Sequence, residues 1–190
     1  MKAILISIKP RFVADILNGK KTLEIRKTCP QMWKWFYTDG RPLREPEPIY
    51  VYIYCTNTKP LIAKDVYSLN GKVVAKFTLN KVEEIKYHFG YYDMGEWTES
   101  YILENACLSA NELDKYLQAS KEYDEKKISR VYGYAWHIDN LVIFDKPKEL
   151  SEFYGTKKYF VGCGNAIDKT PRYEQLHHAP QSWCYIRDVL

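Results

Sequence analysis

No apolar run in this 190-residue sequence approaches the roughly 20 residues that a membrane-spanning helix needs. The apolar opening is too short for a secretory signal, and no small-residue cleavage site follows it. The five cysteines are scattered, odd in number and never spaced as Cys-x-x-Cys, which favours reduced thiols over disulfides or a zinc site. We therefore expect a cytoplasmic protein that does not enter a membrane.

Several motifs of common enzyme and cofactor sites are also missing. The sequence has no Walker motif, no Gly-x-Gly-x-x-Gly and no Gly-x-Ser-x-Gly, and it shows no triad pattern, internal repeat or low-complexity tract. The adjacent His177 and His178 have no carboxylate or cysteine at a metal-binding spacing. We therefore expect neither a cofactor nor a metal ion.

Charge is distributed unevenly along the chain. The formal net charge is only +4, but residues 1–60 hold eleven Lys and Arg against five Asp and Glu. Residues 81–126 reverse this balance, with five basic against eleven acidic side chains. A basic part and an acidic part in one small protein could direct an anionic ligand, although an unevenly charged solvated surface has the same composition.

Hydrophobic patterning predicts an α+β fold in a chain whose length fits one domain. Residues 3–8 form a continuous apolar run, as in a strand covered on both faces, and residues 49–55 alternate between aliphatic side chains and tyrosine. Another strand is expected after Gly71. A short helix should start at Pro10 and stop near Gly19, where glycine can turn left-handed.

The second half of the chain combines a helix with further strands. Ser109 and Glu112 form a capping box for a helix that should run to about Ala119. Residues 134–138 and 141–144 have the composition of strands, and the Asp-Asn pair between them predicts a hairpin.

The segment from Gly19 to Lys27, GKKTLEIRK, carries five charges in nine residues. If it forms a strand, Leu23 and Ile25 point to one face, whereas Glu24 and Arg26 point to the other and can pair. Such a pair is either an ordinary surface ion pair, worth about 0–1 kcal/mol, or part of a site. In a site, Arg26 would offer its planar fork to a phosphate or carboxylate, and Glu24 would orient it.

Taken together, these segments resemble the ASCH family, a branch of the PUA-like superfamily. The family signature is similar to Gly-x-Lys-x-x-Glu-x-Arg after a first strand and helix, and here it is filled by Gly19, Lys21, Glu24 and Arg26. The segments after Gly71, at 134–138 and at 180–185 resemble a longer form of the family that is common in bacterial and phage genomes. The resemblance indicates one domain over residues 1–190, with elaborations at about 28–48 and 86–131.

This resemblance implies a partly open, mixed β-barrel with a few short helices packed at its ends and a cleft lined by the first motif. Relatives with this fold bind RNA or single nucleobases, small bacterial members of the family resemble amidohydrolases that deacylate N4-acetylcytidine, and others are assigned ribonuclease activity. The amidohydrolase motif reads Lys-Thr-x-Thr. Here Lys21 and Thr22 match it, but Glu24 stands at the second threonine position, and Glu83 and Glu84 are the candidates for its distant glutamate.

Three classes of function remain open. The first is a module that binds RNA or a nucleotide, with Lys9, Lys21 and Arg26 on phosphate and aromatic side chains on the base. The second is an amidohydrolase or ribonuclease in which Lys21 and Glu24 are catalytic. The third is a regulatory domain whose acidic stretch at 86–131 contacts a basic protein partner.

We favour the first class, although some of its residues also have a purely structural explanation. Trp136 and Trp183 belong to a core unless one of them walls a base pocket, and His137 is either a hydrogen-bonding strand residue or an acid or base. The predicted ligand-binding residues are Ser7, Lys9, Lys21, Thr22, Glu24, Arg26, Trp136, His137 and Trp183.

Overall fold

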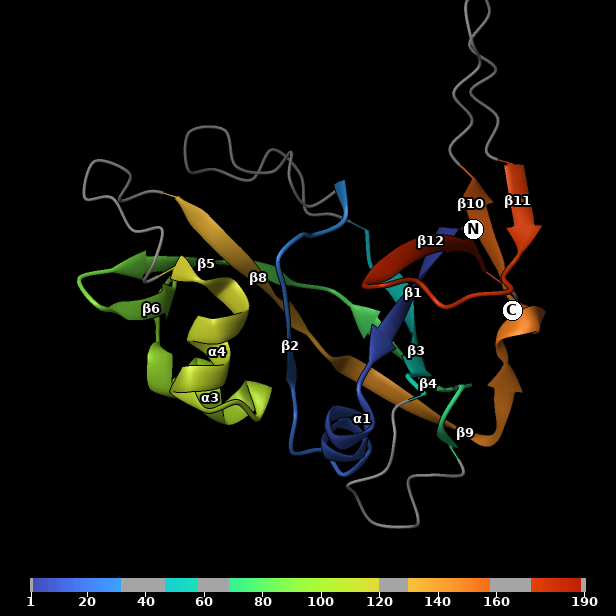
Figure 1. The fold of residues 1–190 in the computed structure, drawn as a ribbon, viewed down its shortest axis with the longest axis horizontal. Helices are drawn as coiled ribbons and strands as arrows, with labels where there is room; N and C mark the ends of the chain where they lie inside the picture. Colours follow the sequence, from blue (N-terminus) through green and yellow to red (C-terminus); the bar gives the residue numbers. More distant parts are fainter. Residues whose placement is uncertain (1, 32–46, 58–68, 120–129, 158–171, 189–190) are drawn as a thin grey trace, which may run out of the picture. The chain divides into compact units, whose positions relative to one another are not determined.

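The computed structural model describes residues 2–31, 47–57, 69–119, 130–157 and 172–188 (Figure 1). Strands and helices are interspersed along the chain, so the predicted α+β class is confirmed. The elements are β1 (Lys2–Ile8), α1 (Pro10–Leu17), β2 (Leu23–Arg26), β3 (Ile49–Cys55), β4 (Lys72–Leu79), β5 (Val82–His88), β6 (Tyr91–Met94), β7 (Trp97–Thr98), α3 (Glu99–Ala106), α4 (Ala110–Leu117), β8 (Val131–His137), β9 (Asp139–Glu149), a 3-10 turn (Leu150–Glu152), β10 (Tyr154–Lys157), β11 (Arg172–Gln175) and β12 (Trp183–Arg187).

The chain divides into two compact units. Unit 1 comprises Met1–Ala14, Ile49–Phe77 and Leu141–Leu190, and unit 2 comprises Asp15–Pro48 and Thr78–Asn140. The predicted elaboration at 86–131 supplies β6, β7, α3 and α4 to unit 2, whereas most of the one at 28–48 lies outside the described residues. The single domain over residues 1–190 and the partly open β-barrel both stay predictions.

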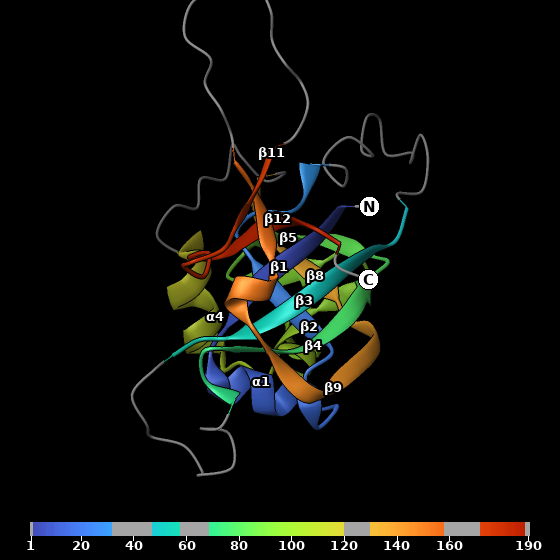
Figure 2. The same cartoon turned by 90° about the vertical axis from the view of Figure 1, so that its right-hand side faces the viewer.

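Unit 1 is built around a seven-stranded mixed sheet in the order β11-β10-β12-β1-β3-β4-β9. At its centre, β1 pairs in parallel with β3 and antiparallel with β12 (Figure 2). The side chains of β1 from Ala3 to Ile8 are all buried, as the continuous apolar run predicts for a strand covered on both faces. On β3 the aliphatic residues are buried, and Tyr52 packs edge-on against Phe153 in the core of this unit.

Unit 2 contains a five-stranded antiparallel sheet in the order β2-β8-β5-β6-β7. The helices α3 and α4 lie next to each other beside this sheet (Figure 1). Their buried residues Ile102, Leu113 and Leu117 share one hydrophobic cluster with Leu23 and Ile25 of β2. The motif strand β2 is an outermost strand in the order of this sheet, and its apolar face is part of the core of unit 2.

Local signals are confirmed at both helix ends that the sequence marks. Gly19 adopts a φ of 71° directly after α1, and its N–H donates to the carbonyl of Ile16 at 2.9 Å. Ser109 caps α4, where the Ser109 hydroxyl and the Glu112 carboxylate each accept from the other residue's backbone N–H. The helix ends at Leu117, close to the expected Ala119.

The predicted hairpin between residues 134–138 and 141–144 is wrong. The two segments are strands, but β8 belongs to the five-stranded sheet and β9 pairs with β4 in the seven-stranded sheet. Both edges of β8 are already paired, with β2 on one side and β5 on the other, so no edge is left for β9. The Asp-Asn pair therefore marks a passage from one sheet to the other instead of a tight turn.

Two further findings concern the described part of the chain alone. Its cysteines, Cys29, Cys55, Cys107 and Cys184, are thiols. None of its helices is long and apolar enough to cross a membrane.

Candidate functional site

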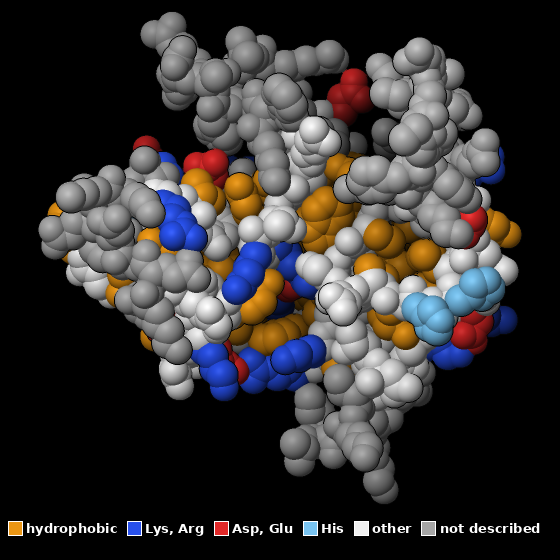
Figure 3. Space-filling model, turned by 45° about the horizontal axis from the view of Figure 1, so that its top comes forward, with side chains coloured by type: hydrophobic (Ala, Val, Ile, Leu, Met, Phe, Trp, Pro, Cys, Tyr) orange, Lys and Arg blue, Asp and Glu red, His pale blue; other side chains and the backbone are white. Residues whose placement is uncertain are grey.

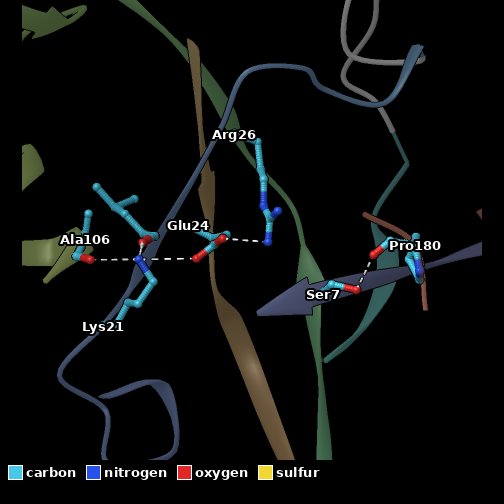
Figure 4. Close-up of polar contacts among 7 residues, drawn as sticks. Ser7, Lys21, Glu24, Arg26, Ala106 and Pro180 are labelled. Atoms are coloured by element: carbon cyan, nitrogen blue, oxygen red, sulfur yellow. Dashed lines mark hydrogen bonds and ion pairs between the residues drawn. The ribbon is translucent and has the colours of Figure 1, made fainter. Parts of the chain in front are cut away.

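The charged residues of the motif meet at the beginning of β2 in unit 2. Leu23 and Ile25 enter the hydrophobic cluster, so Glu24 and Arg26 lie on the opposite face of the strand, as alternation predicts. Glu24 Oε1 lies 2.8 Å from the Nη2 atom of Arg26, and Glu24 Oε2 lies 3.3 Å from the Nζ atom of Lys21 (Figure 4). Glu24 thus bridges two cations, and these three residues are named the charge cluster below.

The charge cluster is buried. Lys21 retains only 3% of its accessible surface, and Glu24 and Arg26 each retain 7%. Taking a charged group out of water costs several kcal/mol unless partners compensate it. Lys21 is therefore not a solvated lysine, and Glu24 and Arg26 do not form an exposed surface pair. The predicted ion pair between Glu24 and Arg26 is confirmed.

Lys21 uses its ammonium group to join β2 to the end of α3. Its Nζ atom donates to the carbonyl of Leu23 at 2.6 Å and to the carbonyl of Ala106 at 2.8 Å, in addition to the contact with Glu24. An ammonium group has three protons, and three acceptors surround it here. The carbonyl of Ala106 belongs to the C-terminal end of α3, where the helix dipole favours a positive charge.

Thr22 adds two hydrogen bonds to the contact between β2 and the end of α3. Its N–H donates to the carbonyl of Asn105 at 2.9 Å, and its exposed hydroxyl donates to the Asn105 side-chain oxygen at 2.8 Å. The adjacent residues Lys21 and Thr22 therefore both hold the last turn of α3 against β2. No sequence pattern indicates this role of Asn105 and Ala106, because the contact joins segments more than 80 residues apart.

Trp136 lies beside the charge cluster on β8. It is the cross-strand partner of Glu24, which places both side chains on the same face of the sheet. The Trp136 side chain is completely buried. Its ring therefore offers no exposed face to a base.

His137 belongs to a second polar group, on the other face of β8. Its Nε2 atom lies 2.6 Å from Glu83 Oε2, and Lys81 lies 3.0 Å from Glu83 Oε1. Burial alone would raise the pKa of Glu83, but the hydrogen bonds with His137 and Lys81 outweigh it and hold that pKa below its usual value. Glu83, one of the two candidates for a distant glutamate, is thus paired with His137 and not with Lys21.

The remaining predicted residues belong to unit 1. Ser7 is buried and donates its hydroxyl to the carbonyl of Pro180 at 2.6 Å (Figure 4). Lys9 is exposed just after β1, and Trp183 is a half-buried residue of β12 that meets Tyr185 edge-on. The residues that the structure brings into contact are therefore Lys21, Glu24 and Arg26, with Thr22 and Trp136 adjoining them.

Two residues near the charge cluster were not predicted from the sequence. Tyr116 of α4 has its hydroxyl near Arg26 and Glu24, and the Nζ atom of Lys27 lies 5.7 Å from the centre of its ring. Within the residues that the structure describes, no group of histidine, cysteine, aspartate or glutamate side chains has the arrangement of a metal site.

The fold and the charge cluster together define an α+β protein with a mixed and an antiparallel sheet and with a buried Lys-Glu-Arg group at a sheet edge. Its fold is similar to that of the ASCH protein of Zymomonas mobilis. The match to a serine-to-alanine variant of that protein has a TM-score of 0.51 at 16% identity and covers 97% of this chain and 88% of the other. The unmodified protein matches with a TM-score of 0.41 at 17% identity, over 78% of this chain and 73% of the other.

The ASCH resemblance inferred from the motif is thereby confirmed at the level of the fold. No family model matches the sequence, and no curated protein matches it.

Proposed function

We propose that this chain is a module that binds RNA or a nucleotide, with the Gly-x-Lys-x-x-Glu-x-Arg motif as its phosphate-binding element. The observation that carries this proposal is the burial of Lys21, Glu24 and Arg26 in mutual contact at the edge of a sheet. Replacing a buried ion group by apolar side chains often leaves the stability of a protein unchanged or increases it. A contribution to stability is therefore a weak explanation for three buried charges at this position. A preorganised guanidinium is a strong reason, because Arg binds phosphate through a planar fork.

The distances support a division of roles within the charge cluster. Lys21 already serves three acceptors, so its role is to position Glu24 and the end of α3. Glu24 in turn holds one edge of the Arg26 guanidinium. Arg26 is then the phosphate-binding residue. Further basic side chains are available on the protein surface, and Figure 3 shows Lys and Arg side chains on one of its faces. Ser7, Lys9, His137 and Trp183 stay predicted contacts.

The same distances support binding over catalysis by Lys21 and Glu24. A lysine that acts as a base or nucleophile needs a free lone pair, whereas the Lys21 ammonium group donates to two carbonyls and a carboxylate. Glu24 also replaces the threonine of the amidohydrolase pattern. An amidohydrolase or ribonuclease that uses these two residues is therefore the less favoured proposal.

A protein-interaction role for the acidic stretch is also less favoured. Several of its carboxylates already serve the fold of unit 2. Asp93 pairs with His88 at 3.2 Å, Glu99 accepts from the N–H of Tyr92 at 2.7 Å, and Glu112 completes the capping box of α4. These groups are engaged within unit 2, which weakens their attraction for a basic partner.

The experiment is a salt titration of single-stranded RNA binding. The wild-type protein should bind a labelled RNA of about eight nucleotides at about 50 mM salt, with an affinity that falls as salt rises. Arg26→Gln should flatten the log–log slope by about 0.7, the value for one phosphate of a single strand. Lys115→Gln, a change at an exposed lysine of unit 2, is the matched control and should leave the slope unchanged.

Unfolding of each variant is measured in parallel, so that a loss of binding is separated from a loss of fold. Absence of salt-dependent binding by the wild type at about 50 mM salt would overturn the proposal. Turnover of N4-acetylcytidine that disappears in Lys21→Ala, at retained fold, would replace it by the enzymatic one.

A further inference from the structure

The last turn of α4 is packed directly onto the motif strand. Gly133 of β8 provides the space, because a Cβ atom at this position would lie 2.7 Å from Leu117 Cδ2 and 3.3 Å from the carbonyl oxygen of Arg26. Leu117 therefore fills the place of a missing side chain next to the backbone of Arg26. The preceding residue in α4 is Tyr116.

Tyr116 is a partly exposed residue in the last turn of α4. More than a third of the residue is exposed, at 38%. Burial nevertheless raises the pKa of its hydroxyl, which lies close enough to Arg26 and Glu24 to sense both charges and forms a hydrogen bond with the Lys27 backbone. A partly exposed aromatic ring thus lies beside Lys27, the residue that follows Arg26 of the charge cluster.

Lys27 adds an exposed cation at the same place. It follows Arg26 in the chain, and its Nζ atom lies 5.7 Å from the centre of the Tyr116 ring. Among the residues that the structure describes, Lys27 has no carboxylate within ion-pair distance. Its ammonium group is therefore available to an anion, and its contact with an exposed ring is weaker than the stacking of a base on that ring.

We propose that Tyr116 stacks on the base of a nucleotide whose phosphate is bound by Lys27 and Arg26. An aromatic face beside two cations matches a planar base joined to a phosphate, the combination that single-strand readers use. Tyr116 takes the role first expected of Trp136, whose ring is buried. The inference rests on the proposed function and assigns the base-contacting residue of that site.

The test compares adenosine 5′-monophosphate, ribose 5-phosphate and a single-stranded RNA of about eight nucleotides. Tyr116→Leu should weaken binding of the nucleotide and the RNA by about 5- to 150-fold, the range that corresponds to loss of one stacked base. It should leave ribose 5-phosphate binding and the salt slope unchanged. Tyr116→Phe keeps the ring and should rescue the affinity to within about threefold of the wild type.

Lys27→Gln should behave in the opposite way, with a slope flattened by about 0.7 and similar losses for all three ligands. Tyr91→Leu and Lys115→Gln are the matched controls. Tyr91 is a half-exposed tyrosine of β6, and Lys115 is the exposed residue before Tyr116 on α4. Both control variants should bind like the wild type.

The outcomes separate this inference from the proposed function. If the wild type binds RNA with the expected salt dependence and Tyr116→Leu binds as tightly as Tyr91→Leu, the assignment of Tyr116 is wrong and the proposed function stands. If the wild type binds neither nucleotide nor RNA, both are wrong. If Tyr116→Phe fails to rescue Tyr116→Leu in a folded protein, the hydroxyl acts instead of the ring, which also overturns stacking.

Discussion

Lys21 is the residue with the clearest energetic role in unit 2. Breaking a buried ion group by removing one of its members costs about 3–5 kcal/mol. In Lys21→Ala, the Glu24 carboxylate would keep Arg26 but lose its second cation, and the carbonyls of Leu23 and Ala106 would lose the donation from Nζ. We expect the free energy of unfolding in urea to fall by an amount in this range.

Lys72→Ala is the control for this measurement. Lys72 pairs with Glu149 at the surface of unit 1, and a pair of this kind contributes about 0–1 kcal/mol. Lys21→Met separates packing from charge, because methionine replaces most of the aliphatic stem of lysine but donates no hydrogen bond. A Lys21→Ala variant no less stable than Lys72→Ala would contradict the role assigned to the ammonium group.

Glu83 leads to a prediction about pH. Its pKa in the folded protein is lowered by the hydrogen bonds with His137 and Lys81, against the effect of burial. A lowered folded pKa contributes stability that is present above the usual value of 4.5 and is lost as the pH falls below it. Glu83→Gln should therefore lower the free energy of unfolding by about 1–3 kcal/mol at neutral pH. This difference in stability from the wild type should shrink as the pH falls below 4.5.

Thermal or urea unfolding of both proteins across the acid range provides the check. Glu84→Gln is the matched change on the same strand, where the carboxylate lies 3.9 Å from Lys86 and is a third exposed. This control should change stability by less than about 1 kcal/mol. A constant difference between wild type and Glu83→Gln across the whole pH range would contradict the assignment.

At the scale of helices and strands, local patterns predicted more than distant pairings did. The capping box at Ser109 and the stop at Gly19 depend on neighbours within a few residues, and both are confirmed. The pairing of β8 was misjudged, because an Asp-Asn pair suits a tight turn and nothing nearby reveals that β2 and β5 already occupy both edges.

The candidate site follows the same rule. Contact between Glu24 and Arg26 could be predicted, since alternation places residues two apart on the same face of a strand. The acceptor role of Ala106 and the position of Tyr116 could not, because α3 and α4 meet β2 only through the packing of unit 2. Sequence patterns thus identified the charged residues but not the helices that bury and border them.

Gly133 tests whether the packing of α4 onto β2 positions the site. Gly133→Ala would force the end of the Leu117 side chain aside and press on the Arg26 carbonyl, at an expected cost of about 1–3 kcal/mol. Leu117→Ala in the same protein frees the space, so the two changes should be less costly together than their sum. Urea unfolding of the two single variants and the double variant measures this coupling, and strict additivity would contradict the contact.

At the scale of the whole molecule, positive charge is concentrated in one unit. Unit 1 contains 14 Lys and Arg against 7 Asp and Glu, a formal charge of +7, whereas unit 2 contains 14 against 17, a formal charge of −3. The two account for the net charge of +4 of the chain. The charge cluster and Tyr116 therefore belong to the acidic unit, and a polyanion would be attracted over a long range by the other one.

A change at Lys9 distinguishes two possible roles of the positive charge in unit 1. Either it attracts the phosphates of a longer RNA strand, or Lys9 binds the same phosphate as Arg26. Lys9 is an exposed residue of unit 1, whereas Arg26 and Tyr116 belong to unit 2. If unit 1 attracts the phosphates of a longer strand while a single nucleotide is held in unit 2, Lys9→Gln should flatten the salt slope for RNA by about 0.7. Its affinity for adenosine 5′-monophosphate should stay within about twofold of the wild type.

Arg26→Gln should weaken both ligands, because the phosphate of a mononucleotide and that of an RNA would use the same guanidinium. Fluorescence anisotropy for the RNA and calorimetry for the nucleotide, each repeated at several salt concentrations, measure the two effects. Equal losses for both ligands in Lys9→Gln would assign Lys9 to the same phosphate as Arg26. An unchanged slope for RNA in Lys9→Gln would exclude Lys9 from phosphate binding and leave the attraction to other cations of unit 1.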